Sequence, residues 1–331
     1  MKRRLFVLIT ALALLPVLIG AGRFALFLLR PTTPPAPVTV SVPSGTSFGQ
    51  IARKLQNNDV VSSVICFKLL ARLRGETAAI QAGDYRFAGA ATPGQVLDRL
   101  VAGDVERHQL TIPEGFSLVE IAHRLQESDF PDAQAFLPLT RDAEFLRSLS
   151  IDAASLEGYL FPETYTFDSR TTARQLILAM VGQGQAELTP ALLAQAKKQG
   201  LNRHQLLTLA SIIQKEAGNN AEMPLISAVF HNRLRRGIAL QADPTVIYGI
   251  KDFDGNLTRR HLREITPYNT YRVPGLPPGP IASPGRTALQ AAANPAAVNY
   301  LYFVARGDGT HKFSSTLREH NAAVRRYQLK R

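Results

Sequence analysis

The sequence of 331 residues has a single cysteine, Cys66, and this scarcity excludes an internal disulfide and any metal site built on a cysteine cluster. Its seven histidines show no metalloenzyme spacing such as His-Glu-x-x-His, so we expect neither a metal nor a cofactor. Acids are also scarce, with 26 Asp and Glu against 38 Lys and Arg, a formal net charge of +12. A basic chain suits an anionic membrane surface or an anionic polymer. Nucleic acid is not expected as a partner, because no recognised nucleic-acid motif and no basic-aromatic interleaving occur.

The N-terminus carries a basic cluster followed by an apolar run. Residues 2–4 are Lys-Arg-Arg, and the run Leu5–Gly22 has 18 residues, at the short end for a membrane span. A cleaved signal peptide is the competing interpretation, but the run is long for its apolar region and no small-x-small cleavage site follows. We therefore expect residues 1–30 to form a single-pass transmembrane anchor. The basic cluster predicts a cytoplasmic N-terminus at the inner (plasma) membrane, with the rest of the chain periplasmic, or extracytoplasmic.

A proline-rich segment and an internal repeat follow the anchor. Residues 31–37 read Pro-Thr-Thr-Pro-Pro-Ala-Pro, which predicts a stiff spacer without helix or sheet. Residues 42–55 then align with residues 112–125, with Pro, Gly, Ser, Ile, Ala and Leu in register. Each copy predicts a strand, a Pro-x-Gly turn and a helix that begins with a capping box at Ser47 or Ser117.

The first copy resembles the LysM module, which binds N-acetylglucosamine-containing glycans. The resemblance implies a small LysM-like domain at residues 38–107. The alternative is a small α+β module used only for spacing or docking. Further helices are predicted at 64–74, 93–102, 173–193 and 224–235, and a short strand at 83–87. The expected fold class is α+β: the transmembrane helix, the small LysM-like α+β domain, and a larger mixed α/β catalytic domain at residues 108–331.

One predicted helix, within Leu207–Gly218, places a carboxylate on its apolar side. Glu216 follows Leu209, Ile212 and Ile213 by seven, four and three residues, so it shares their face. Asn202 with Gln205 predicts a capping box at the start of the helix, and Gly218 predicts its end. Burial and the negative end of the helix dipole both raise the pKa of a carboxyl group, and a protonated carboxyl is what a general acid requires. The alternative is an amphipathic helix whose last-turn Glu merely reaches water.

The C-terminal third is rich in turn-forming and aromatic strings, such as those at 240–249, 266–285 and 300–313. Ordered loops of this kind are typical of binding surfaces. Together with YLFPETY, ASIIQKEAG and VFHNRL, the strings LQADPTVIYG, YNTY, GLPPGPIASPG and YFVARGDGTHKF resemble the YceG-like (MltG) family of endolytic murein transglycosylases. The resemblance runs from about residue 38 to residue 327, and its long, ordered motifs make it specific.

The resemblance implies an activity. The family cleaves the β-1,4 bond between N-acetylmuramic acid and N-acetylglucosamine within nascent peptidoglycan strands, leaves a 1,6-anhydro end, and terminates or releases new strands. Its essential acid corresponds to Glu216. Many members carry a second acid two residues earlier, where this chain has Gln214. Peptidoglycan glycan strands are thus the expected partner, with peptidoglycan synthases as candidate partners.

Several polar and aromatic side chains of these strings are candidates for substrate contact. Glu157, Asn321 and His320 are weaker candidates. Asp243 could equally cap the turn that follows it, and Tyr248 could equally pack in the core. The candidates are Glu163, Asn232, Gln241, Asp243, Tyr248, Tyr268, Asn269, Tyr271 and His311.

Two rival functions remain open from the sequence. A non-catalytic peptidoglycan-binding scaffold would use the LysM-like domain and treat Glu216 as structural. A hydrolase would need a second carboxylate, Glu163 or Asp243, to activate water. A transglycosylase needs only one, because the C6 hydroxyl of the sugar serves as the nucleophile.

Overall fold

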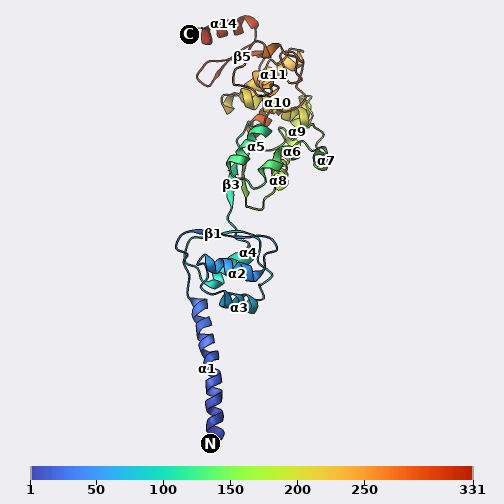
Figure 1. Ribbon diagram of the computed structural model, residues 1–331. Helices are drawn as coiled ribbons and strands as arrows, with labels where there is room; N and C mark the ends of the chain where they lie inside the picture. The colour runs from blue at the N-terminus through green and yellow to red at the C-terminus, as the bar shows by residue number, and fades with distance from the viewer. Residues whose placement is uncertain (1, 330–331) are drawn as a thin grey trace. The chain divides into compact units, whose positions relative to one another are not determined.

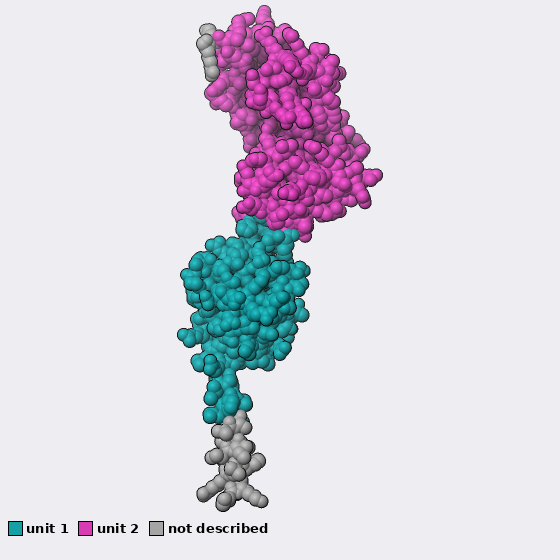
Figure 2. Space-filling model, in the orientation of Figure 1, with its two compact units in different colours: residues 1–108, 166–170 teal, residues 109–165, 171–331 magenta. Residues whose placement is uncertain are grey.

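The computed structural model describes residues 2–329, with side chains from residue 14 onward. It divides into two compact units (Figures 1 and 2): unit 1 comprises Met1–His108 with Thr166–Arg170, and unit 2 comprises Gln109–Tyr165 with Thr171–Arg331. Helices dominate both units, and the described strands form two-stranded sheets, β1-β2, β3-β4 and β5-β6. The predicted α+β class is confirmed.

Helix α1 (Lys2–Leu29) covers the predicted anchor. Within the described part of the chain, no helix is both long enough and apolar enough to cross a membrane. The single-pass anchor expected at residues 1–30 stays a prediction. The side chains of residues 1–13, which include half of the apolar run, lie outside the described residues.

The last turn of α1 is built into unit 1. Phe27 is 7% exposed in the core, and Phe24 and Leu28 pack against the same core. The proline-rich segment that follows was expected to form neither helix nor sheet, and residues 31–37 contain no helix or strand. An isolated bridge occurs at Thr32, whose N–H and carbonyl exchange hydrogen bonds of 2.9 and 3.1 Å with Ala91. This bridge ties the segment to the domain.

Unit 1 packs three helices against one antiparallel sheet. Strand β1 (Val38–Val42) pairs with β2 (Gly83–Phe87) from Val38↔Phe87 to Val42↔Gly83. Alternate residues of both strands are buried, as expected for a half-covered sheet. Helices α2 (Phe48–Asn57), α3 (Val64–Arg74) and α4 (Pro93–Ala102) complete the core. The LysM-like character of this unit stays a prediction.

The second copy of the repeat opens the larger unit. Strand β3 (His108–Thr111) pairs with β4 (Thr164–Phe167), and α5 (Leu118–Glu127) follows β3. The capping boxes predicted at Ser47 and Ser117 are both present. Two short helices then follow, α6 (Ala133–Leu139) and α7 (Ala143–Ser148).

The long helix predicted at 173–193 is wrong. The segment divides into α8 (Ala173–Glu187) and α9 (Pro190–Lys198), because Thr189 caps a new helix whose first residue is Pro190. The chain continues through α10 (Arg203–Glu216), α11 (Met223–Arg235), α12 (Asp243–Tyr248) and α13 (Arg286–Ala293). It ends in the hairpin β5 (Tyr302–Ala305) and β6 (His311–Ser314) and in α14 (Leu317–Tyr327).

Candidate active site

Helix α10 is the central helix of unit 2 and packs against α9, α11, α12 and α13. The predicted capping box is present: the Asn202 side chain accepts from the Gln205 N–H at 2.9 Å, and the Gln205 side chain accepts in return. Leu209, Ile212 and Ile213 have no exposed surface. Glu216 is the last residue of α10, on the face that these residues define.

The end of α10 is set by a close approach of chain segments. Gly218 was expected to end the helix, and α10 does end two residues before it; the cap is Ala217 in an extended conformation, and the φ of Gly218 is not positive. A Cβ at Gly218 would lie 2.5 Å from the carbonyl oxygen of Gly309. Glycine is therefore needed here so that the β5–β6 turn can lie against the end of α10.

Glu216 lines a cavity of about 350 Å³ in unit 2. Its walls come from α10, α11, the segment before α12, the β5–β6 hairpin and α14. Besides Glu216 itself, the cavity is lined by Arg233, Leu240, Gln241, Asp243, Tyr271, Phe303, Val304, Ala305, His311, His320, Val324 and Gln328.

The surroundings of Glu216 favour its protonated form. Burial is the largest cause, the negative charge of Asp243 adds to it, and the positive charge of Arg233 opposes both. Together they raise the pKa of Glu216 to about 8. The carboxyl group is therefore mostly protonated at neutral pH, as a proton donor must be.

Arg233 connects several segments that line the cavity. Its side chain is 7% exposed. Its Nε donates to the Leu301 carbonyl at 2.7 Å, and its Nη1 donates to the carbonyls of Ala239 (3.1 Å) and Leu240 (2.9 Å) and to Gln241 Oε1 (3.2 Å). One buried guanidinium thus joins α11 to the start of β5 and to the segment that leads into α12.

The segment before α12 holds strained backbone. Gln241 has φ of +51°, a left-handed conformation that is uncommon for a residue with a Cβ. Hydrogen bonds to Thr270 hold it in place: the Gln241 N–H donates to the Thr270 carbonyl and the Ala242 N–H to Thr270 Oγ1. Asp243 follows, and Tyr271 Oη donates to Asp243 Oδ1 at 2.6 Å.

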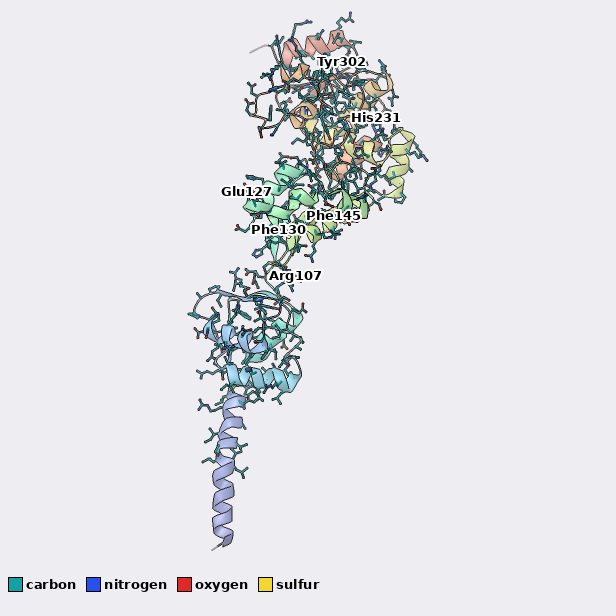
Figure 3. All side chains as sticks on the ribbon, turned by 45° about the vertical axis from the view of Figure 1, so that its right-hand side comes forward. Arg107, Glu127, Phe130, Phe145, His231 and Tyr302 are labelled. Carbon is teal, nitrogen blue, oxygen red and sulfur yellow. The ribbon has the colours of Figure 1, made fainter. Side chains whose placement is uncertain are left out.

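The hairpin and α14 form the remaining wall. His311 lies beside Glu222, which accepts from its backbone N–H at 3.0 Å and lies 2.8 Å from its Nδ1. The His320 ring stacks on Tyr302, with centroids 5.1 Å apart. Burial and then the charge of Arg233 lower the pKa of His320, which keeps this ring neutral. Tyr302, at the start of β5, is labelled in Figure 3.

The structure brings four of the substrate-contact candidates together with Glu216 in this cavity: Gln241, Asp243, Tyr271 and His311. Gln214 lies outside it, where its side chain accepts from the Gly285 N–H at 3.0 Å. Because residue 214 does not line the cavity, a glutamine in place of an acid there removes no carboxyl group from it.

The other candidates do not line the cavity, and their contacts are with the protein itself. Asn232 donates to the carbonyls of Val298 and Tyr300. Asn269 has no exposed surface and closes a turn by donating to the carbonyls of His261 and Glu264.

Two aromatic candidates and one acid also contact the protein itself outside the cavity. Tyr248 donates to Glu157 at 3.1 Å, and its ring contacts Tyr268 at a centroid distance of 4.8 Å. Glu163 is exposed, and its side chain accepts from the adjacent Thr164 N–H.

Arg233 is the main cavity residue that the sequence did not single out. It follows Asn232 in the string VFHNRL, where nothing in the periodicity separates it from the exposed arginines that come next. His231, Asn232 and Arg233 are all buried, but three consecutive helix residues do not share one face, so the spacing carries no signal for Arg233. The apolar residues Phe303 and Val304 were likewise missed, because a cavity wall and a core have the same composition.

A larger cavity of about 570 Å³ lies at the other end of α10, around His204, His231 and Arg235. No Asp or Glu is among its lining residues, so it offers no carboxyl group as proton donor. Within the described part of the chain, no group of three or more His, Cys, Asp or Glu is placed to hold a metal ion. The Glu216 cavity holds a carboxyl group whose pKa is raised, as a proton donor requires, and is the candidate active site.

A model of the YceG-like family matches residues 40–326. The chain belongs to the YceG-like family. It is 34% identical over 326 residues to the endolytic murein transglycosylase of Bacillus subtilis (strain 168), covering 93% of this chain and 90% of the relative. It is 31% identical over 299 residues to the protein of the same name from Streptococcus pneumoniae serotype 2 (strain D39 / NCTC 7466), covering 81% of this chain and 54% of that relative. A crystal structure of a YceG-like protein from Listeria monocytogenes is similar, with a TM-score of 0.60 and 34% identity, over 87% of this chain and 99% of the other.

A second acid with a raised pKa lies outside the cavity and has a structural effect. Glu157 is 4% exposed, accepts from the Leu118 N–H at the start of α5 and from Tyr248 Oη, and has its pKa raised to about 7, mainly by burial. The folded state therefore binds this proton more tightly than the unfolded state, whose value is 4.5. This contribution to stability is complete below pH 4.5 and is lost as the pH rises through 7.

We expect Glu157→Gln to remove this pH dependence. The free energy of unfolding of wild type minus that of the variant should be about 3 kcal/mol more positive at pH 4 than at pH 8. Chemical denaturation at the two pH values measures it. An equal difference at both values would show that Glu157 titrates normally.

Proposed function

We propose that the chain is an endolytic lytic transglycosylase that cleaves the β-1,4 bond between N-acetylmuramic acid and N-acetylglucosamine within peptidoglycan strands. The names of its relatives support this reaction. The observation that carries it is that Glu216, one of the two carboxyl groups that line a cavity of about 350 Å³, has its pKa raised to about 8. Such a group suits a reaction that needs one proton donor and no activated water.

The proposed reaction uses Glu216 twice. The protonated carboxyl donates its proton to the glycosidic oxygen while the bond from that oxygen to C1 of the muramic acid breaks. The N-acetyl group of the same sugar stabilises the positive charge at C1. The C6 hydroxyl oxygen then bonds to C1 and gives its proton to Glu216, which is again protonated. The products are a 1,6-anhydro end and a free C4 hydroxyl, with no water consumed.

Digestion of purified glycan strands tests the proposal. The wild-type protein should release fragments whose muramic acid ends are one water lighter than hydrolysis products, as measured by mass spectrometry. Reducing ends would show a hydrolase, in which Asp243 has the position to activate water. Intact glycan would show a non-catalytic scaffold.

The cavity residues have proposed roles in substrate binding. Gln241 and Tyr271 offer an amide and a hydroxyl to sugar oxygens, and His311, held by Glu222, offers its free ring nitrogen. Asp243 is proposed to act on Glu216 through its charge, because it faces the same cavity and raises the pKa of the acid.

We expect kcat/KM to fall about tenfold per pH unit above pH 8, as Glu216 loses its proton. Asp243→Asn removes a negative charge that raises the pKa of Glu216, while its side-chain oxygen can still accept from Tyr271. The alkaline limb of the pH profile should therefore move to lower pH. Asp254→Asn, a charge removal outside the cavity, serves as the matched control and should leave the limb in place. If the alkaline limbs of wild type, Asp243→Asn and Asp254→Asn lie at the same pH, the proposed role of Asp243 is contradicted.

The cellular setting is part of the proposal. Residues 1–30 are proposed to anchor the chain in the inner membrane, with the N-terminus cytoplasmic and the catalytic domain periplasmic; basic residues 2–4 followed by the apolar run Leu5–Gly22 support this. Unit 1 is proposed to bind glycan through its LysM-like strand–turn–helix. Peptidoglycan synthases are the proposed partners, because they supply nascent strands at the same membrane.

A further inference from the structure

Helix α3 leaves an apolar face uncovered. It is capped by Ser63 and ends at Gly75, and Phe67, Leu70 and Ala71 bury its inner face in unit 1. The opposite face carries three large apolar side chains, Ile65, Leu69 and Leu73, which are 80%, 43% and 70% exposed. Their spacing of four residues places them along one side of the helix.

The exposure is confined to two helices. In the described part of unit 1, every exposed large apolar side chain lies on α1 or α3, and none lies on the strands, α2 or α4. Those of α1 include Leu26 and Leu29, which are 67% and 77% exposed at the end of that helix. Contiguous apolar exposure of this kind marks an interaction surface.

The two helices share one end of unit 1. The last turn of α1 is held there by Phe27 in the core and by the bridge between Thr32 and Ala91. In the views of Figures 1 and 3, α3 lies at the end of the domain from which α1 projects. The exposed apolar side chains at the end of α1 and those of α3 therefore lie at the same end of unit 1.

The charge around the apolar face is positive. Helix α3 has three basic residues and no acid. Arg74 is paired with Glu76 and Asp98, but Lys68 and Arg72 form no salt bridge among the described residues. Both lie beside Ile65, at spacings of three and seven residues.

We propose that α3 is an interfacial helix that lies on an anionic bilayer surface. Ile65, Leu69 and Leu73 enter the boundary between headgroups and acyl chains, and Lys68 and Arg72 extend to the lipid phosphates. Membrane contact by unit 1 fixes the domain against the bilayer. This contact is independent of the chemistry at Glu216.

The absence of tryptophan from the chain allows a direct test. Ile65→Trp and Ile265→Trp place single tryptophans at two isoleucines of matched exposure, 80% and 79%, on α3 and in unit 2. The full-length variants are reconstituted with phosphatidylglycerol vesicles that contain lipids brominated near the headgroup. We expect the fluorescence of Ile65→Trp to be blue-shifted and quenched several-fold more than that of Ile265→Trp. Equal quenching and equal emission would overturn the proposal.

Charge reversal distinguishes an anionic lipid surface from other partners that could bind the apolar face of α3. In the Ile65→Trp background, replacing both Lys68 and Arg72 by Glu should reduce the quenching several-fold, and phosphatidylcholine vesicles should do the same. Unchanged quenching in both cases would overturn the role of the anionic surface. A blue shift produced by soluble glycan oligomers without vesicles would assign the face to glycan instead. Cleavage activity on soluble glycan should stay at the wild-type rate, so failure of this proposal is distinct from failure of the proposed reaction.

Discussion

Glu216→Gln is expected to reduce the rate of glycan cleavage by about 10²–10⁴-fold. The amide has nearly the shape of the carboxylic acid but has no acidic proton to transfer to the glycosidic oxygen. The cavity walls should be unaffected, because the Glu216 side chain forms no hydrogen bond among those described. Release of anhydro ends from a defined glycan polymer, measured by chromatography and mass spectrometry, gives the rate.

Glu163→Gln is the matched control for this loss. Glu163 is an exposed glutamate of the same unit; its side chain accepts from the Thr164 N–H and does not line the cavity. The variant should cleave at the wild-type rate. Loss of turnover in Glu163→Gln, with the fold intact by circular dichroism, would instead favour a two-carboxylate hydrolase.

Arg233→Met is expected to cause the second large effect, on both stability and activity. The variant leaves the carbonyls of Leu301, Ala239 and Leu240 without their buried donor. Unfolding should become easier by about 3–5 kcal/mol, the usual cost of breaking a buried charged network. Cleavage should also slow, because the cavity loses the group that fixes both Gln241 and the start of β5. Chemical denaturation and the anhydro-end assay measure the two effects.

The pH dependence of the activity that Arg233→Met retains should show the effect of the lost positive charge. Because Arg233 lowers the pKa of Glu216, its removal should move the alkaline limb to higher pH, opposite to the shift expected for Asp243→Asn. Arg236→Met, an exposed arginine at the end of the same helix, should change neither stability nor the pH profile. A destabilisation by Arg236→Met as large as that by Arg233→Met would show that the loss is not specific to the buried network.

Much of the local structure could be predicted because it depends on short-range patterns. The helix at Val64–Arg74, the strand at Gly83–Phe87 and the capping boxes of both repeats are specified by residues within one or two turns of each other. The helix predicted at 173–193 failed because its apolar pattern continues across Leu188, while Thr189 and Pro190 start a new helix. The bridge of Thr32 to Ala91 joins segments far apart in the sequence, which periodicity does not reach.

The site residues divide in the same way, into those that short-range patterns predict and those that depend on the fold. Glu216 could be placed on a buried face from its spacing to Leu209, Ile212 and Ile213. Asn232 and Asn269 resembled binding residues, yet both satisfy backbone carbonyls of folded loops. A polar residue in a turn-rich string serves either purpose, and only the fold distinguishes them.

Arg233 is the opposite case: it lines the cavity, but the sequence did not single it out. Four acceptors from two segments, residues 239–241 and Leu301, hold its guanidinium. A single sequence without the fold gives no reason to expect an arginine to be buried there.

The protonation state of Glu216 tests the account most directly. Difference infrared spectra between wild type and Glu216→Gln isolate the carboxyl band of this one residue. We predict a protonated carboxyl at pH 7 that ionises with a pKa of about 8. A carboxylate already ionised at pH 5, in a folded protein, would contradict the assignment of Glu216 as the proton donor.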